Sequence, residues 1–189
     1  MITCKLNLKG ISPYSQSAPT QSPRNDNEPY EKFEERVWRE HIHSDPEGKV
    51  FIPPLGLKNC LSSAARFLGL TIPGKGKSTF TKRFESGVII ADPIYLDGLH
   101  RDQIASERLF LPSDGKKGGG RRVWKIYPLI PAWKASATIF VIDPQITKLY
   151  MQRHIEAAGR FIGFGRFRPE MGGYYGRFEG IIADWKGDE

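Results

Sequence analysis

The sequence predicts an α+β fold in which one antiparallel sheet carries two helices and long insertions. Strand-like segments occur near both ends of the chain and between residues 123 and 143, where apolar residues are frequent or alternate with polar ones. Two segments with apolar residues at helical spacing, 54–69 and 143–159, lie between the strands. At 189 residues, the length favours a single domain, residues 1–189, with one core.

The first strand is expected over residues 2–9. Apolar residues occupy every second position from Ile2 to Leu8, which is the period of a strand with one buried face. Residues 12–30 contain four prolines and many small polar residues, so they predict a long mobile loop that is too polar for the core. Residues 30–43 fit either a short helix or a strand.

The clearest helix follows Pro53 and Pro54 and ends at Gly69. Residues 71–122 have the least regular sequence, and they predict a protruding insertion that contains some strand. The apolar stripe of the helix consists of Leu57, Leu61, Ala64, Ala65 and Leu68.

Regular patterns return after this insertion. Residues 123–130 and 136–143 are expected to be strands, and their apolar content favours a central place in a sheet. In the helix that follows, Asp143 is the candidate N-cap, Pro144 the first helical residue and Gly159 the stop.

A final strand is expected from Tyr174 to Asp184. Without insertions at about residues 10–54 and 71–122, the order of elements is close to βαββαβ. This is the ferredoxin-like, or RRM-like, plan of an antiparallel sheet with two helices on one face. RNA-recognition modules place stacking aromatic residues on the other face of such a sheet.

Composition favours an acidic partner. Lys and Arg number 28 against 21 Asp and Glu, a formal net charge of +7, which suits nucleic acid or an anionic surface. Cys4 and Cys60 are the only cysteines, so we expect no disulfide framework and no paired-cysteine metal site. With no apolar run near the ~20 residues that span a bilayer, we expect a cytoplasmic protein without a membrane partner or a cofactor.

The segment FIGFGRFRPEMGGYYGRFEG, residues 161–180, concentrates glycine, arginine and aromatic residues between the second helix and the last strand. Glycines permit close approach of another backbone, and exposed N–H groups of such a loop can cradle phosphates. Phe161, Ile162 and Phe178 are expected to pack in the core. The residues expected to contact nucleic acid by charge or stacking are Arg160, Phe164, Arg166, Phe167, Arg168, Tyr174, Tyr175 and Arg177.

Two segments together resemble the markers of the RAMP superfamily, the repeat-associated RNA-binding proteins of CRISPR effector complexes. IGFGRFRPEMGGYYGRF resembles their glycine-rich loop, and FIPPLGLKNCLSSAARFLG resembles their strand ending in Ile-Pro and the Leu-Lys helix after it. The Cas7-like branch is the most similar, because it combines this early helix with a long insertion. The chain is short for a Cas7-like subunit and has Pro-Leu-Gly where the family more often has Gly-Ser-Ser.

This resemblance implies that Lys58 and Arg66 line a backbone-binding groove together with the glycine-rich loop. Family members bind single-stranded guide RNA along a filament of identical subunits, and a thumb-like hairpin of each subunit displaces a base. The insertion at residues 71–122 would then be a thumb. Its basic residues expected to follow phosphates are Lys75, Lys77, Lys82, Arg83, Lys116, Lys117, Arg121 and Arg122.

The predicted function is non-catalytic binding of single-stranded RNA, or of single-stranded DNA, beside copies of itself and other CRISPR effector subunits. One alternative is a stand-alone viral or mobile-element relative that binds such strands, or that docks into and inhibits an effector. A second alternative is a metal-dependent nuclease that uses Asp26, His41, His43 or Asp45.

Overall fold

A six-stranded antiparallel sheet forms the centre of the computed structural model, which describes residues 1–113, 118 and 120–187. Its strand order is β2-β4-β7-β1-β8, and the short β3 pairs with β7. This antiparallel pairing confirms the predicted α+β class. The strands are β1 (Ile2–Gly10), β2 (Lys49–Ile52), β3 (Val88–Ile89), β4 (Ile94–His100), β7 (Lys134–Val141) and β8 (Phe178–Gly187).

Strand β1 lies between β7 and β8, and its alternating pattern is confirmed. Cys4, Leu6 and Leu8 are buried, while the polar residues between them are exposed. Leu6 lies opposite Ala137 in β7, and Leu8 lies opposite Ala135. Small residues on β7 leave room for the side chains of the helices that cover this face.

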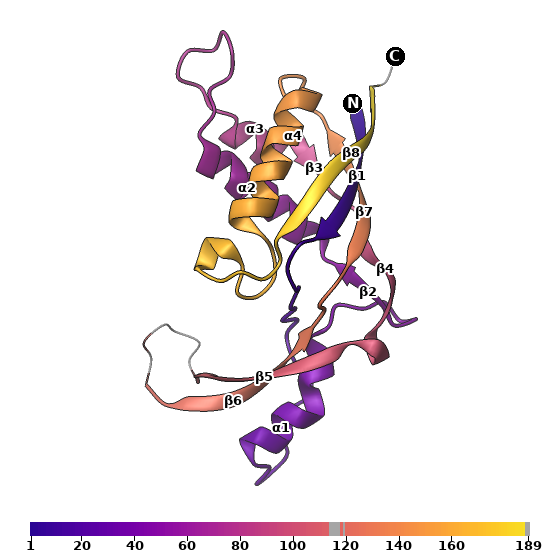
Figure 1. The fold of residues 1–189 in the computed structure, drawn as a ribbon, viewed down its shortest axis with the longest axis vertical. Helices are drawn as coiled ribbons and strands as arrows, with labels where there is room; N and C mark the ends of the chain where they lie inside the picture. The colour runs from indigo at the N-terminus through magenta and orange to yellow at the C-terminus, as the bar shows by residue number, and fades with distance from the viewer. Residues whose placement is uncertain (114–117, 119, 188–189) are drawn as a thin grey trace.

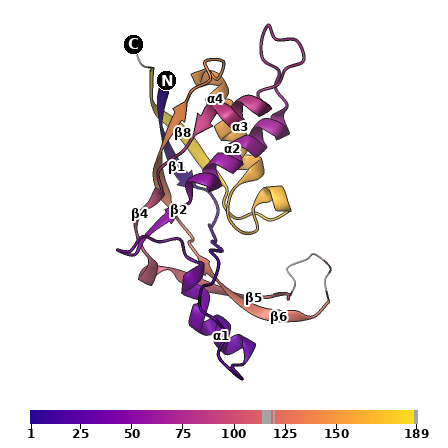
Figure 2. The ribbon, with the colours of Figure 1, turned by 180° about the vertical axis from the view of Figure 1, so that it is seen from behind.

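Helices α2 (Pro54–Leu68) and α4 (Lys148–Ala157) pack side by side on one face of the sheet, with α3 (Thr81–Gly87) next to α2 (Figures 1 and 2). The predicted boundaries of α2 are confirmed, because Gly69 is left-handed (φ 55°) and its N–H donates to the carbonyl of Ala65. Within the described part of the chain, no helix combines the length and the apolar character needed to cross a membrane.

The second predicted helix differs at both ends. It begins at Lys148, and the Asp143 carboxylate instead accepts a hydrogen bond from the N–H of Gln145 within a turn. Gly159 does not stop the helix, because Ala158–Ile162 continues α4 as a π-helical turn. A Cβ at Gly159 would lie 1.9 Å from the Phe178 carbonyl oxygen, so glycine here permits close approach of β8.

The strand predicted over residues 123–130 exists but lies outside the main sheet. As β6 (Arg122–Leu129) it pairs with β5 (Ala105–Pro112) in a separate hairpin that projects from the body (Figure 1). The position that was expected for this strand in the main sheet is occupied by β4, which lies within the insertion predicted at residues 71–122. Ile94 and Leu96 of β4 are buried, whereas Trp124 of β6 is exposed, so apolar content alone misassigned the central strand.

The segment between β1 and β2 is not a uniform polar loop. It contains the helix α1 (Tyr30–Val37), and Tyr14, Ser15 and Gln16 are buried. The side chain of Gln16 donates to the carbonyl of Phe51 and accepts from the N–H of His43. Because backbone groups satisfy its amide, a polar residue enters the core, and the expectation of a loop too polar for the core is wrong at these positions.

Candidate nucleic-acid interface

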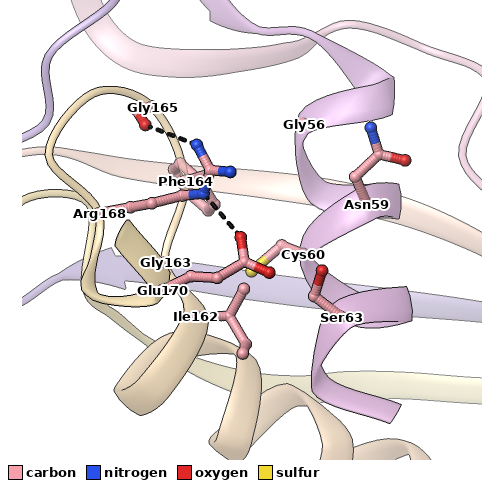
Figure 3. Close-up of a pocket in the computed structure, with 10 residues that line it drawn as sticks. All are labelled: Gly56, Asn59, Cys60, Ser63, Ile162, Gly163, Phe164, Gly165, Arg168 and Glu170. Atoms are coloured by element: carbon pink, nitrogen blue, oxygen red, sulfur yellow. Dashed lines mark hydrogen bonds and ion pairs between the residues drawn. The ribbon is translucent and has the colours of Figure 1, made fainter. Parts of the chain in front are cut away.

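A groove separates α2 from the glycine-rich loop, residues 163–177, and contains a pocket of about 190 Å³ (Figure 3). The helix contributes small and polar side chains to one wall, and the loop contributes glycines and a charged pair to the other. The residues that line the pocket include Gly56, Asn59, Ser63, Gly163, Arg168 and Glu170.

The glycine-rich loop is a packed wall. A Cβ at Gly165, whose φ is +79°, would lie 2.4 Å from the Ser15 carbonyl oxygen. A Cβ at Gly176 would lie 1.9 Å from the Phe164 carbonyl oxygen, and the N–H of Gly176 donates to Pro13 at 2.7 Å. The glycines therefore let the loop pack against itself and against the segment after β1, which gives the groove a fixed shape.

Two cations border the groove. The Arg168 guanidinium pairs with Glu170 at 2.9 Å and donates to the carbonyl of Gly165. On α2, the Arg66 guanidinium pairs with Glu85 and donates to the Ser63 hydroxyl, both at 2.9 Å. Both guanidinium groups retain accessible surface beside the groove, which suits contact with a phosphate.

Glu170 extends from the loop toward α2 (Figure 3). Partial burial would raise the pKa of this carboxyl, but hydrogen bonds from Arg168 and Ser63 outweigh burial and lower it. The carboxylate therefore stays charged and connects the two walls. It also offsets part of the positive charge of the groove.

Lys58 lies outside the groove that the resemblance implied for it. Its ammonium group donates to the carbonyls of Phe84 and Glu85, at the end of α3. Burial lowers the pKa of Lys58. The side chain thus binds carbonyl groups at the C-terminal end of α3, a structural role for a cation at a helix terminus.

Two aromatic residues expected to stack on bases are core residues, which corrects that expectation. Phe164 is 3% exposed and stacks on Phe178, with ring centroids 5.0 Å apart. Tyr175 is 8% exposed, and its hydroxyl donates to the Glu107 carboxylate at 2.9 Å. Burial and this carboxylate raise the pKa of Tyr175. The ring of Phe161, expected in the core, is exposed instead.

Arg166 joins the glycine-rich loop to the β5–β6 hairpin. Its guanidinium carbon lies 3.0 Å from the centre of the Tyr127 ring, and its backbone N–H donates to Ser15. Burial lowers the pKa of Arg166, while Tyr127 and Glu107 act in the opposite direction. This environment fits a structural residue and leaves little of the guanidinium free for a phosphate.

The remaining predicted residues of this segment are accessible. Phe167 and Tyr174 are exposed, and so is Arg160 in the π-helical turn. The Arg177 guanidinium is half-buried and donates to the carbonyl of Arg160 at 2.7 Å. These four residues, together with Arg66 and Arg168, remain predicted contacts for a strand.

The basic residues of the predicted thumb are divided between distant parts of the molecule. Lys75 and Lys77 lie on an exposed loop between α2 and α3, at the opposite end of the molecule from the hairpin (Figure 1). Lys82 is exposed on α3, and Arg83 pairs with Asp143 at 3.1 Å.

Within the described part of the chain, β5 and β6 form the hairpin that was predicted for a thumb. Arg121 and Arg122 are exposed where β6 begins, toward the hairpin's far end. Lys116 and Lys117 lie outside the described residues. Because the predicted insertion is divided in this way, Lys75 and Lys77 cannot contact the same short segment of a strand as Arg121 and Arg122.

The candidate nuclease residues do not converge. His41 contacts the carbonyl of Ala18 at 2.8 Å, and the Asp45 carboxylate accepts from the N–H of Lys49. Burial lowers the pKa of His43. Across residues 1–113, 118 and 120–187, no three His, Cys, Asp or Glu side chains are grouped so as to hold a metal ion.

Asn59 and Ser63 line the groove but were not predicted. They lie four residues apart on α2, so they share one helix face. The family resemblance instead pointed to Lys58, which lies on a neighbouring flank of α2 and contacts α3. The signal that could have identified Asn59 and Ser63 is the row of small polar residues beside the apolar stripe of α2.

The sequence matches no protein-family model and no curated protein. Among solved structures, the chain is similar to a chain of the type III-B Cmr-beta bound to cognate target RNA, seen by cryo-EM. The two are 13% identical, with a TM-score of 0.55, over 97% of this chain and 60% of that chain. The chain is also similar to Cmr6 from Pyrococcus furiosus, seen in a crystal structure. These two chains are 11% identical, with a TM-score of 0.47, over 96% of this chain and 99% of that chain. The first similarity shows a shared fold, and our chain spans about 60% of that neighbour's length.

Proposed function

We propose that this chain is a non-catalytic Cas7-like protein of the RAMP superfamily that binds single-stranded RNA in the groove between α2 and the glycine-rich loop. The observation that carries this proposal is the groove itself. Its loop wall is the segment that resembles the RAMP glycine-rich loop, and Arg66 and Arg168 border it.

The fold supports the proposal. Strands β4, β7, β1 and β8 with crossover helices α2 and α4 on one face have the order of a ferredoxin-like core. The similarity to Cmr-beta extends over nearly the whole chain, and that protein is bound to target RNA, which favours RNA as the ligand. Assembly with copies of this chain and with other CRISPR effector subunits belongs to the same proposal.

The groove suits a strand better than the uncovered sheet face does. On the central strands, that face presents mostly polar side chains, among them Lys5, Asn7, Ser136 and Thr138, and one half-buried ring, Phe140. Stacking of several bases there, as in RNA-recognition modules, would need more exposed rings on the central strands. In the groove, guanidinium groups can contact phosphates while Phe167 and Tyr174 offer exposed rings nearby.

The test is equilibrium binding of the nuclease-treated protein to labelled single-stranded RNA and DNA over a series of salt concentrations. For the wild type, the logarithm of the binding constant should fall linearly with the logarithm of salt, by roughly 0.7 for each phosphate contacted. The double variant Arg66→Ala with Arg168→Ala should bind more weakly and with a slope smaller by about 1.4, since it removes two such contacts.

A matched control removes two cations from the opposite side of the sheet, Lys5→Ala with Lys134→Ala. It should leave the affinity close to that of the wild type. Equal losses in both double variants would point to net charge rather than to the groove. If neither strand binds, the proposal is wrong, and protein partners become the object of the search.

A further inference from the structure

Two phenylalanine rings stack on each other at the surface of the molecule. Phe67, near the end of α2, is 59% exposed, and Phe161, in the π-helical turn after α4, is 47% exposed. Their ring centroids lie 5.0 Å apart, and their planes are inclined by 27°. Because the two rings are in contact, they form a contiguous apolar patch at the surface, and contiguous patches of this kind mark interaction sites.

The pair lies next to the groove. Phe67 follows Ser63 by four residues on α2, so it occupies the same helix face as Ser63 and Asn59. Phe161 directly precedes Ile162, which lines the pocket from the other side. A strand that follows α2 along the groove would therefore meet the two rings where it leaves.

Cations surround the pair. The Arg160 guanidinium carbon lies 5.7 Å from the centre of the Phe161 ring. Arg177 donates to the carbonyl of Arg160, and Arg66, the residue before Phe67, donates to Ser63. Guanidinium groups beside exposed rings match a phosphodiester strand, whose charge and bases lie side by side, better than they match an apolar protein segment.

We propose that the Phe67–Phe161 pair is the platform on which an unpaired base of the bound strand stacks as the strand leaves the groove. This inference rests on the proposed function and adds a base-contacting site beside the guanidinium groups that the groove offers to phosphates. It assigns to Phe161 a role in binding, and it brings in Phe67, a residue on the other wall.

The experiment compares two ligands of roughly 12 nucleotides, within the range of single-strand site sizes: a mixed-sequence RNA and an abasic strand of equal length. The abasic strand keeps the phosphates and has no bases. Phe161→Ala and Phe67→Ala should each weaken binding of the RNA about tenfold and leave binding of the abasic strand unchanged.

Conservative variants separate stacking from folding. Phe161→Tyr should bind the RNA as the wild type does, whereas Phe161→Leu, which keeps apolar volume, should lose affinity as Phe161→Ala does. Tyr95→Ala is the matched control, because it removes another exposed ring, on β4. Thermal unfolding of each variant shows that it is folded.

Two results would overturn the inference while the proposed function stands. One is an unchanged affinity of Phe161→Ala and Phe161→Leu for the RNA. The other is an equal loss on both ligands, which would mean that the rings only shape the groove. If the wild type binds neither ligand, the base platform and the proposed function both fall.

Discussion

The guanidinium group of Arg166 lies against the Tyr127 ring, and Glu107 and Glu34 favour its charged form. Arg168, two residues further along, retains accessible surface and pairs with Glu170 at 2.9 Å. Both residues belong to the same short basic segment, but only Arg168 borders the groove. The position of each side chain relative to the hairpin therefore decides which arginine can meet a ligand.

Replacing Arg166 should destabilise the protein. Arg166→Ala removes a desolvated cation–π contact worth about 2 kcal/mol, and Arg166→Lys should lose most of the same contact, because an ammonium group does not stack flat on a ring. The free energy of unfolding, measured with urea, should fall by about 2 kcal/mol in either variant. Arg153→Ala is the control, because Arg153 is exposed on α4 with its guanidinium carbon 6.0 Å from the centre of the Tyr150 ring, and it should change this free energy by less than about 1 kcal/mol.

A folded Arg166→Ala variant with unchanged stability and weaker binding of single strands would contradict this role. It would return Arg166 to the predicted nucleic-acid contacts, since a purely structural contact cannot be removed without a cost in stability.

The glycine-rich loop acts as an element with its own packing. It turns back on itself, with the N–H of Tyr175 donating to Phe167 and the N–H of Phe164 donating to Gly176. Side chains of the loop also enter the core and contact the hairpin, as the Tyr175–Glu107 hydrogen bond shows. The loop is therefore a fixed wall of the groove.

Two adjacent glycines test this view of the loop. A Cβ at Gly173 would lie 1.9 Å from the Phe167 carbonyl oxygen, so Gly173→Ala should lower the free energy of unfolding by about 3 kcal/mol. Gly172 has φ +82° with nothing near its Cβ position, so Gly172→Ala should cost only about 1 kcal/mol of backbone strain. Urea denaturation measures both. Equally small losses at the two positions would mean that the loop shifts to accommodate the new Cβ at residue 173 and is not a fixed wall.

At the scale of the whole molecule, the core holds the groove at one side while two extensions project in different directions (Figures 1 and 2). One is the β5–β6 hairpin, and the other is the loop with Lys75 and Lys77 between α2 and α3. Extensions that point away from a shared groove suit contacts between neighbouring subunits on one strand better than contacts within one subunit.

Assembly on a strand is the corresponding prediction. Size-exclusion chromatography with light scattering should show larger particles when the nuclease-treated protein meets single-stranded RNA of about 40 nucleotides, which exceeds several site sizes. The variant Arg66→Ala with Arg168→Ala should stay at the size of the free protein at the same concentration. An unchanged size of the wild type with both RNA and DNA would contradict assembly on nucleic acid.

The sequence by itself determined the features that depend on neighbouring residues. Alternation fixed β1, and the prolines before α2 with Gly69 after it fixed the clearest helix. The glycine-rich segment was also recognisable, because its composition and its place before the last strand are local properties.

Only the tertiary structure decided which of these residues face the groove. Tyr175 and Glu107 lie 68 residues apart in sequence, and the rings of Phe67 and Phe161 come from different helical elements. Periodicity describes one element at a time, whereas burial depends on which distant element covers each face. For this reason β6 was expected in the main sheet and Lys58 in the groove, whereas the structure places β6 in the hairpin and Lys58 against α3. The exposed phenylalanine pair likewise becomes visible only in the folded chain.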